Sequence, residues 1–256
     1  DYTHKSLGGN GNYNEADANL TNSWEGFPND VVIGGFDFAS ETGQKDYNPL
    51  EFPDNWESYV GGTGTMAASL IRQASSNAKI LAYKVEGVAF NGAHYKQNRT
   101  NVLSALEMAV DPNLDGDLSD SADVVVLNTA AASFGFYKEF ETGMDSSNVE
   151  VRMIRSLAAA GILVVLPVGD SSAFFEFRFD SSGKVIVDED GLPKRFTIYH
   201  QSYFNISSRA TAPEAISVGK SNVENGEYVA DKATGIGPTR GDSIIKPDIL
   251  SANREI

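Results

Sequence analysis

An acidic segment near the middle of the chain carries side chains suited to binding a divalent cation. Oxygen-bearing side chains alternate with other residues there, and Gly116 permits a sharp turn, as in a calcium loop. The candidate ligands are Asp111, Asn113, Asp115, Asp117 and Asp120. The twelfth position, where an EF-hand places a bidentate Glu, is Ala122. The segment predicts a Ca²⁺ site, and the alternative is a solvated acidic turn after a helix over 102–110.

Other side chains that commonly do chemistry are sparse. The chain has no Cys, which excludes disulfides and thiolate metal sites. Its three histidines are His4, His94 and His200, and no two of them have the spacing of metal ligands. We therefore predict surface or structural roles for all three.

The composition favours a folded and strongly acidic protein. Hydrophobic residues make up 41% of the 256 positions, enough for one large domain or two small ones. The 35 acidic residues outnumber the 20 basic ones, which gives a net charge of −15. Such a surface repels phosphate backbones, so nucleic acid is not an expected partner. No apolar run approaches the roughly 20 residues of a membrane-spanning helix.

Strand and helix patterns alternate along the chain, which predicts a parallel sheet with helices on both faces. We expect helices over 65–75, 102–110 and 151–160, and strands over 31–33, 36–38, 80–85, 124–127, 162–166 and 215–219. The continuous apolar run Val124–Leu127 is typical of a strand buried on both faces. Residues 171–209 form a long mixed insert with a hairpin expected around 188–191. No clean domain boundary is visible.

Six segments match, in order, the motifs of one known family. They read DYTH with LGG (1–9), VIGGFDF (32–38), LEMA with DPNLDGD (106–117), ATAPEAISVG (210–219), GPTRGD (237–242) and KPDI (246–249). The chain thereby resembles the subtilase family of subtilisin-like serine peptidases. The resemblance implies a three-layer α/β fold with a parallel sheet and helices on both faces.

The resemblance also implies that the residues needed for catalysis are altered. A subtilase needs a Ser nucleophile, a His base, an Asp and an oxyanion-binding amide. Thr63 stands at the His position and has no basic nitrogen, although its segment also resembles a serine motif with the serine deleted. Asp170 replaces the amide, and its charge would repel an oxyanion. The substrate-lining strand is reduced to Ala130, Ala131 and Ala132.

These features lead to a set of expectations. The family's catalytic Asp and Ser fall outside the chain, so residues 1–256 are expected to form one subtilase-like domain. That domain would lack an N-terminal central strand and a C-terminal serine helix, which another chain, another copy or another part of the polypeptide would supply. The expected function is a non-catalytic extracellular scaffold or binding module, secreted or at the cell surface, with a protein or peptide partner. The alternatives are a fragment of a secreted subtilisin-like endopeptidase and a calcium-stabilised structural subunit.

Overall fold

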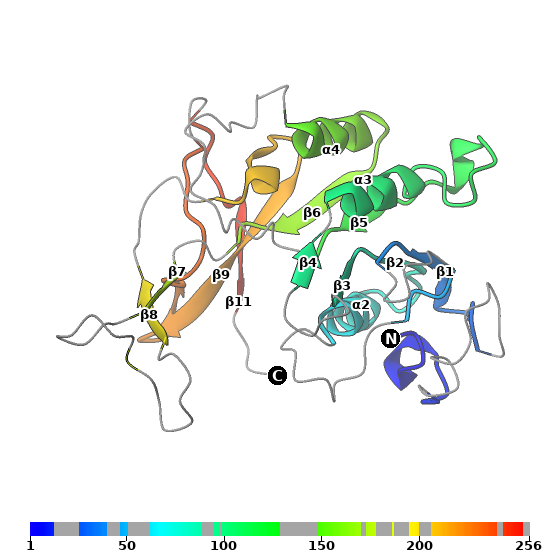
Figure 1. The fold of residues 1–256 in the computed structure, drawn as a ribbon, viewed down its shortest axis with the longest axis horizontal. Helices are drawn as coiled ribbons and strands as arrows, with labels where there is room; N and C mark the ends of the chain where they lie inside the picture. The colour runs from blue at the N-terminus through cyan, green and yellow to red at the C-terminus, as the bar shows by residue number, and fades with distance from the viewer. Residues whose placement is uncertain are drawn as a thin grey trace. The chain divides into compact units, whose positions relative to one another are not determined.

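The computed structural model divides the chain into two compact units, Asp1–Asp123 and Val124–Ile256, which we take separately. The structure describes residues 1–12, 26–39, 47–50, 62–88, 95–97, 99–128, 148–169, 173–177, 186, 195–199, 206–239 and 243–252 (Figure 1).

The first unit contains short strands, two α-helices and two 3₁₀ turns. In chain order they are η1 (Lys5–Leu7), β1 (Val32–Asp37), α2 (Thr63–Ala74), β2 (Ile80–Lys84), β3 (Glu86–Val88), β4 (Tyr95–Gln97), α3 (Arg99–Met108) and η2 (Leu118–Asp120). Strands β1 and β2 pair in parallel, whereas β3 and β4 form an antiparallel pair. The predicted strands over 31–33 and 36–38 are thus one strand, β1.

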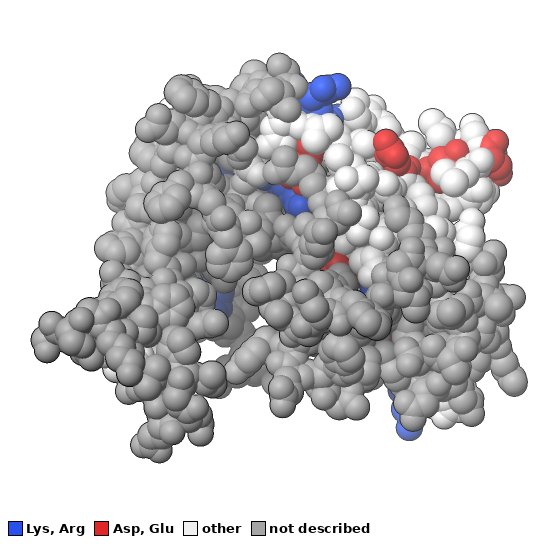
Figure 2. Space-filling model, in the orientation of Figure 1, with Lys and Arg blue, Asp and Glu red and all other residues white. Residues whose placement is uncertain are grey.

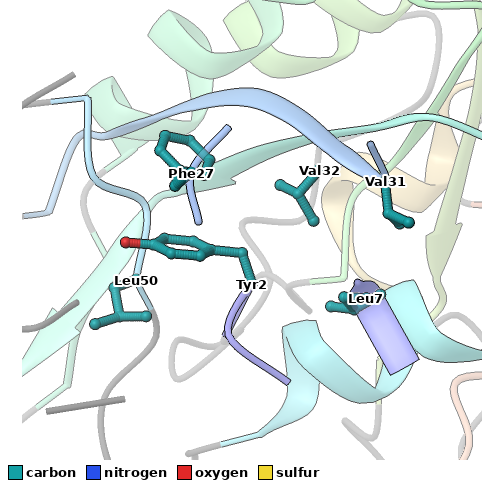
Figure 3. Close-up of a cluster of buried hydrophobic side chains, with 6 residues drawn as sticks. All are labelled: Tyr2, Leu7, Phe27, Val31, Val32 and Leu50. Atoms are coloured by element: carbon teal, nitrogen blue, oxygen red, sulfur yellow. The ribbon is translucent and has the colours of Figure 1, made fainter. Parts of the chain in front are cut away.

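A small apolar core holds the N-terminal segment against β1. Its buried side chains are Tyr2, Leu7, Phe27, Val31, Val32 and Leu50, which converge on one interior (Figure 3). The rings of Tyr2 and Phe27 stack with their centroids 4.4 Å apart. The Tyr2 hydroxyl donates to the Asn48 side-chain oxygen at 2.6 Å, which satisfies its polar end inside the core.

Tyr83 connects β2 to α3 and gives a first testable prediction. Its hydroxyl donates to the Met108 carbonyl at 3.1 Å, and burial, followed by the negative charge of Asp120, raises the pKa of Tyr83 to about 12. Subtracting the ultraviolet pH titration of Tyr83→Phe from that of wild type should reveal one phenol that ionises near pH 12. Because the folded pKa is raised, the stabilisation from this tyrosine is complete below pH 10 and is lost as the pH rises towards 12. A difference step centred at pH 10 would contradict the burial argument.

The second unit is built around a mixed five-stranded sheet. Its elements are β5 (Val124–Val126), α4 (Val149–Ala159), β6 (Leu163–Pro167), β7 (Ala173–Phe177), β8 (Arg195–Tyr199), η3 (Ser208–Thr211), β9 (Ile216–Glu224), β10 (Glu227–Ala230) and β11 (Ile249–Ala252). Strands β5, β6, β9 and β11 pair in parallel, and β10 runs antiparallel to β9. Strands β7 and β8 form a separate antiparallel pair.

Helix α4 forms where the sequence predicts a helix. The Asn148 side chain caps its start by accepting from the backbone N–H groups of Glu150 and Val151. Val151, Ile154 and Leu157 recur at helical spacing and are fully buried. The chain then turns at Gly161, whose φ of +88° is the left-handed conformation common after a helix. Helix α4 thereby covers β6 and η3.

The predicted three-layer parallel sheet with helices on both faces is wrong for the part of the chain that is described. Those residues form four sheets, two of them antiparallel pairs, and three α-helices. Asn225 and Gly226, with φ of 53° and 85°, make the tight turn that sends β10 back along β9. The expected burial of Val124–Leu127 on both faces is also wrong, because the side chains of Val124 and Val126 are 49% and 44% exposed.

Candidate functional site

A groove of about 460 Å³ opens on the sheet of the second unit. Its apolar floor comes mainly from adjacent strands and the residues that follow them: Val126, Leu127, Val165, Leu166, Pro167 and Val218. Leu127 and Pro167 lie at the carboxyl ends of β5 and β6, the edge at which parallel sheets commonly bind ligands.

Strand pairing dictates which residues reach the groove. Val126 pairs with Val165 across β5 and β6, and Pro167 pairs with Val218 across β6 and β9. Gly219 allows β11 to pack closely beside this floor, because a Cβ atom there would lie 2.8 Å from carbon atoms of both Leu250 and Pro247. The apolar floor is therefore a product of the sheet register.

Polar groups line the same groove. They are Asn128, Lys220, Thr234 and Ser251. The Thr234 hydroxyl accepts from the Lys220 backbone N–H at 2.9 Å, and the Ser251 hydroxyl donates to the Gly219 carbonyl at 3.2 Å. Among the described residues that line the groove there is no His, Asp or Glu, so they supply no carboxylate–histidine pair for acid–base chemistry. Their arrangement suits binding.

A partly buried polar network holds β11 on β9 next to the groove. The Lys246 ammonium donates to the Ala215 carbonyl at 2.8 Å and to Asp248 Oδ2 at 2.7 Å. The same carboxylate oxygen accepts from the backbone N–H and the hydroxyl of Ser217, each at 2.7 Å. Burial raises the pKa of Asp248, but these hydrogen bonds and the charge of Lys246 outweigh it, and the pKa is lowered overall.

Of the two substituted catalytic positions, Thr63 and Asp170, the structure describes Thr63, and Thr63 does not line the groove. Thr63 is the exposed first residue of α2, in the first unit. Asp170, Ala130, Ala131 and Ala132 lie outside the described residues. Asn128, two residues before the alanine run, does line the groove.

The acidic segment after α3 folds as a series of side-chain turns. Asp111 accepts from the backbone N–H groups of Asp115 at 3.2 Å and Gly116 at 3.0 Å. Asp115 in turn accepts from the backbone of Asp117 at 2.7 Å, and the Asn113 amide donates to Asp115 at 2.9 Å. Figure 2 shows acidic side chains exposed on this part of the surface. The carboxylates of Asp111 and Asp115 thus accept hydrogen bonds from the local backbone.

The remaining two candidate ligands extend the same turns. Asp117 accepts from the backbone N–H of Ser119 at 3.0 Å, and its hydrogen bonds to Ser119 lower the pKa of Asp117. Asp120 is the last residue of η2, and its negative charge helps to raise the pKa of Tyr83. Within the described ranges, no group of three or more His, Cys, Asp or Glu side chains is placed to hold a metal ion. The geometry gives the Ca²⁺ expectation no support, and calcium binding stays a prediction.

Sequence reasoning missed the cation and hydroxyls of the groove. Lys220, Thr234 and Ser251 come from β9, from the loop after β10 and from β11, and no local motif links them. The clearest overlooked signal was the Asn225-Gly226 dipeptide, which is typical of a two-residue hairpin. It would have placed β10 antiparallel to β9.

None of the described helices is long and apolar enough to cross a membrane, as expected from the sequence.

Comparisons with known proteins give a likeness of fold. No family model and no curated protein matches the chain. The solved structure of the Clostridium perfringens CspB protease matches all of this chain and 74% of its own, at 12% identity and a TM-score of 0.53. An S41 psychrophilic protease (18% identity, TM-score 0.40) and the prenylagaramide maturation protease PagA (11%, 0.36) match 69% and 63% of this chain. The chain spans only 43% and 39% of those two proteins.

These findings correct the interpretation drawn from the motifs. The identification as a degenerate subtilase is not upheld, since the described residues form one mixed sheet, two antiparallel pairs and one parallel pair in place of the expected parallel array. With it fall the inactive subtilisin-like scaffold, the fallback to a subtilisin-like endopeptidase, and the assignment to a structural assembly. A secreted or cell-surface location is tested by none of these findings and stays a prediction. What the comparisons support is a fold similar to that of the CspB protease over the whole chain.

Proposed function

We propose that the second unit binds an apolar polypeptide segment in the groove across β5, β6 and β9. The observation that carries the proposal is an apolar cavity of about 460 Å³ on a sheet whose neighbouring valines are exposed. Ligand sites are typically concave and apolar with a few polar groups, and contiguous exposed apolar surface marks interaction sites. A polypeptide ligand also agrees with the likeness to the CspB protease, because a protease binds polypeptide.

The polar lining supports a polypeptide over a purely apolar ligand. Asn128 carries both donors and an acceptor, and Thr234 and Ser251 carry hydroxyls, which are suited to the amide groups of a peptide backbone. The acid excess of the chain, with a net charge of −15, disfavours nucleic acid. The proposed partner is accordingly a protein or peptide.

Placing a charge on the groove floor tests the proposal. The ligand for the assay is reduced, carboxymethylated lactalbumin, an unfolded polypeptide, labelled with fluorescein and followed by anisotropy. We expect wild type to bind it and Val126→Asp to bind at least about tenfold more weakly, because a carboxylate would be buried against apolar side chains.

The matched control is Val223→Asp. Val223 is a valine on β9 that is 56% exposed and does not line the groove. This variant should bind as wild type does. Failure of wild type to bind, or equal loss of binding in both variants, would contradict the proposed site.

A further inference from the structure

We infer that Lys220 makes the groove selective for segments that carry an Asp or Glu side chain beside their apolar residues. The inference rests on the proposed function, since it concerns which polypeptides the groove accepts. Lys220 is the one charged residue among the described residues that line the groove.

The charge of Lys220 is only weakly countered by the fold. Its side chain is 54% exposed, and its ammonium lies 3.8 Å from Asp231 Oδ2, at the outer limit of an ion pair. The Asp231 carboxylate already accepts from the Asn222 amide at 2.6 Å and from the Ala233 backbone at 2.7 Å. Asp231 is thus engaged in the loop, and Lys220 can pair with an incoming carboxylate.

At Lys220, the nearby charges affect a bound carboxylate more than the net charge of the whole chain does. At physiological salt, charges more than about 8 Å apart are largely screened, so the distributed net charge of −15 has little effect on a group inside the groove. A carboxylate bound within a few ångströms of the Lys220 ammonium is much less screened than these distant charges.

The position of Lys220 favours a side-chain carboxylate over the end of a chain. Lys220 lies on β9, and the lining continues beyond it to Ser251 on β11. A segment that fills the groove therefore passes Lys220 rather than stopping at it. The carboxylate is then supplied by an internal Asp or Glu.

The test compares two amidated, fluorescein-labelled heptapeptides, Gly-Leu-Val-Glu-Leu-Val-Gly and the same sequence with Gln for Glu. We expect wild type to bind the Glu peptide about two- to fivefold more tightly, with the ratio falling as salt is raised. Lys220→Met should bring the ratio to about one, and Lys220→Glu should reverse the preference. Lys232→Met, a change at an exposed lysine outside the groove, should keep the wild-type ratio.

Each of the remaining outcomes contradicts one identified part of the proposal. If wild type binds the Glu and Gln peptides equally, or if Lys220→Met keeps the wild-type preference, the role of Lys220 is wrong. Binding of the Gln peptide in that case still supports the groove as a binding site. Binding of neither peptide overturns the proposed function and the inference together. If a Gln peptide with a free C-terminal carboxylate gains as much affinity as the Glu peptide, and Lys220→Met removes that gain, the assignment to a side chain is wrong.

Discussion

Replacing Arg209 with methionine is expected to lower the free energy of unfolding by about 3–5 kcal/mol. The Arg209 guanidinium donates to Glu150 Oε1 from Nε at 3.0 Å and from Nη2 at 2.8 Å, and the two side chains are 3% and 1% exposed. Removing the cation leaves the Glu150 carboxylate buried beside η3 without its counter-charge. Urea denaturation of wild type and variant at pH 7 measures the loss.

Two further variants separate the buried charge from general damage. Arg209→Met combined with Glu150→Leu should recover much of the loss, since replacing both members of a buried pair with apolar residues is often neutral. Arg155→Met breaks another ion pair of α4, with Glu214, in which the side chains are 41% and 34% exposed. That change should cost less than about 1 kcal/mol. Equal losses for Arg209→Met and Arg155→Met would show that burial of the pair does not matter.

The substitution Asp248→Asn is expected to lower the free energy of unfolding by about 2–3 kcal/mol at pH 7. It removes the negative charge that faces the buried Lys246 ammonium and weakens the hydrogen bonds from Ser217. The folded pKa of Asp248 is lowered, so its stabilisation is present above the ordinary value of 3.8 and is lost as the pH falls through the folded value. Urea denaturation from pH 7 to pH 2 should show the two proteins converging below pH 3.8.

Lys246→Met provides the comparison for this network. It removes the buried cation and leaves Asp248, whose side chain is 37% exposed, free to be hydrated. We expect Lys246→Met to destabilise the protein less than Asp248→Asn, because Asp248→Asn leaves the buried Lys246 ammonium without the negative charge of Asp248. A constant difference between wild type and Asp248→Asn across the pH range would rule out the carboxylate charge as the source of the effect.

Local patterns predicted the positions of elements well. Val151, Ile154 and Leu157 have helical spacing and form the buried face of α4, and Gly161 lies just after its end. The apolar run before Val168 likewise forms β6. Such signals lie within one segment, so hydrophobic period and turn residues are enough to locate them.

Pairing between distant residues could not be predicted in the same way. Glu150 lies just before the helix predicted over 151–160, and nothing local indicates that it is fully buried beside Arg209, 59 positions away. Val124 and Val126 read as interior, but an apolar run does not specify whether another element covers it. The groove combines residues of β5, β6, β9 and β11, so its composition depends on sheet order.

The ion pair between α4 and η3 also imposes an order of events on biosynthesis. Glu150 is made 59 residues before Arg209, which at 5–20 residues per second is an interval of about 3–12 s. Throughout that interval a docked α4 would bury the Glu150 carboxylate without the guanidinium of Arg209. Docking of α4 against η3 is therefore favoured only after Arg209 has left the ribosome.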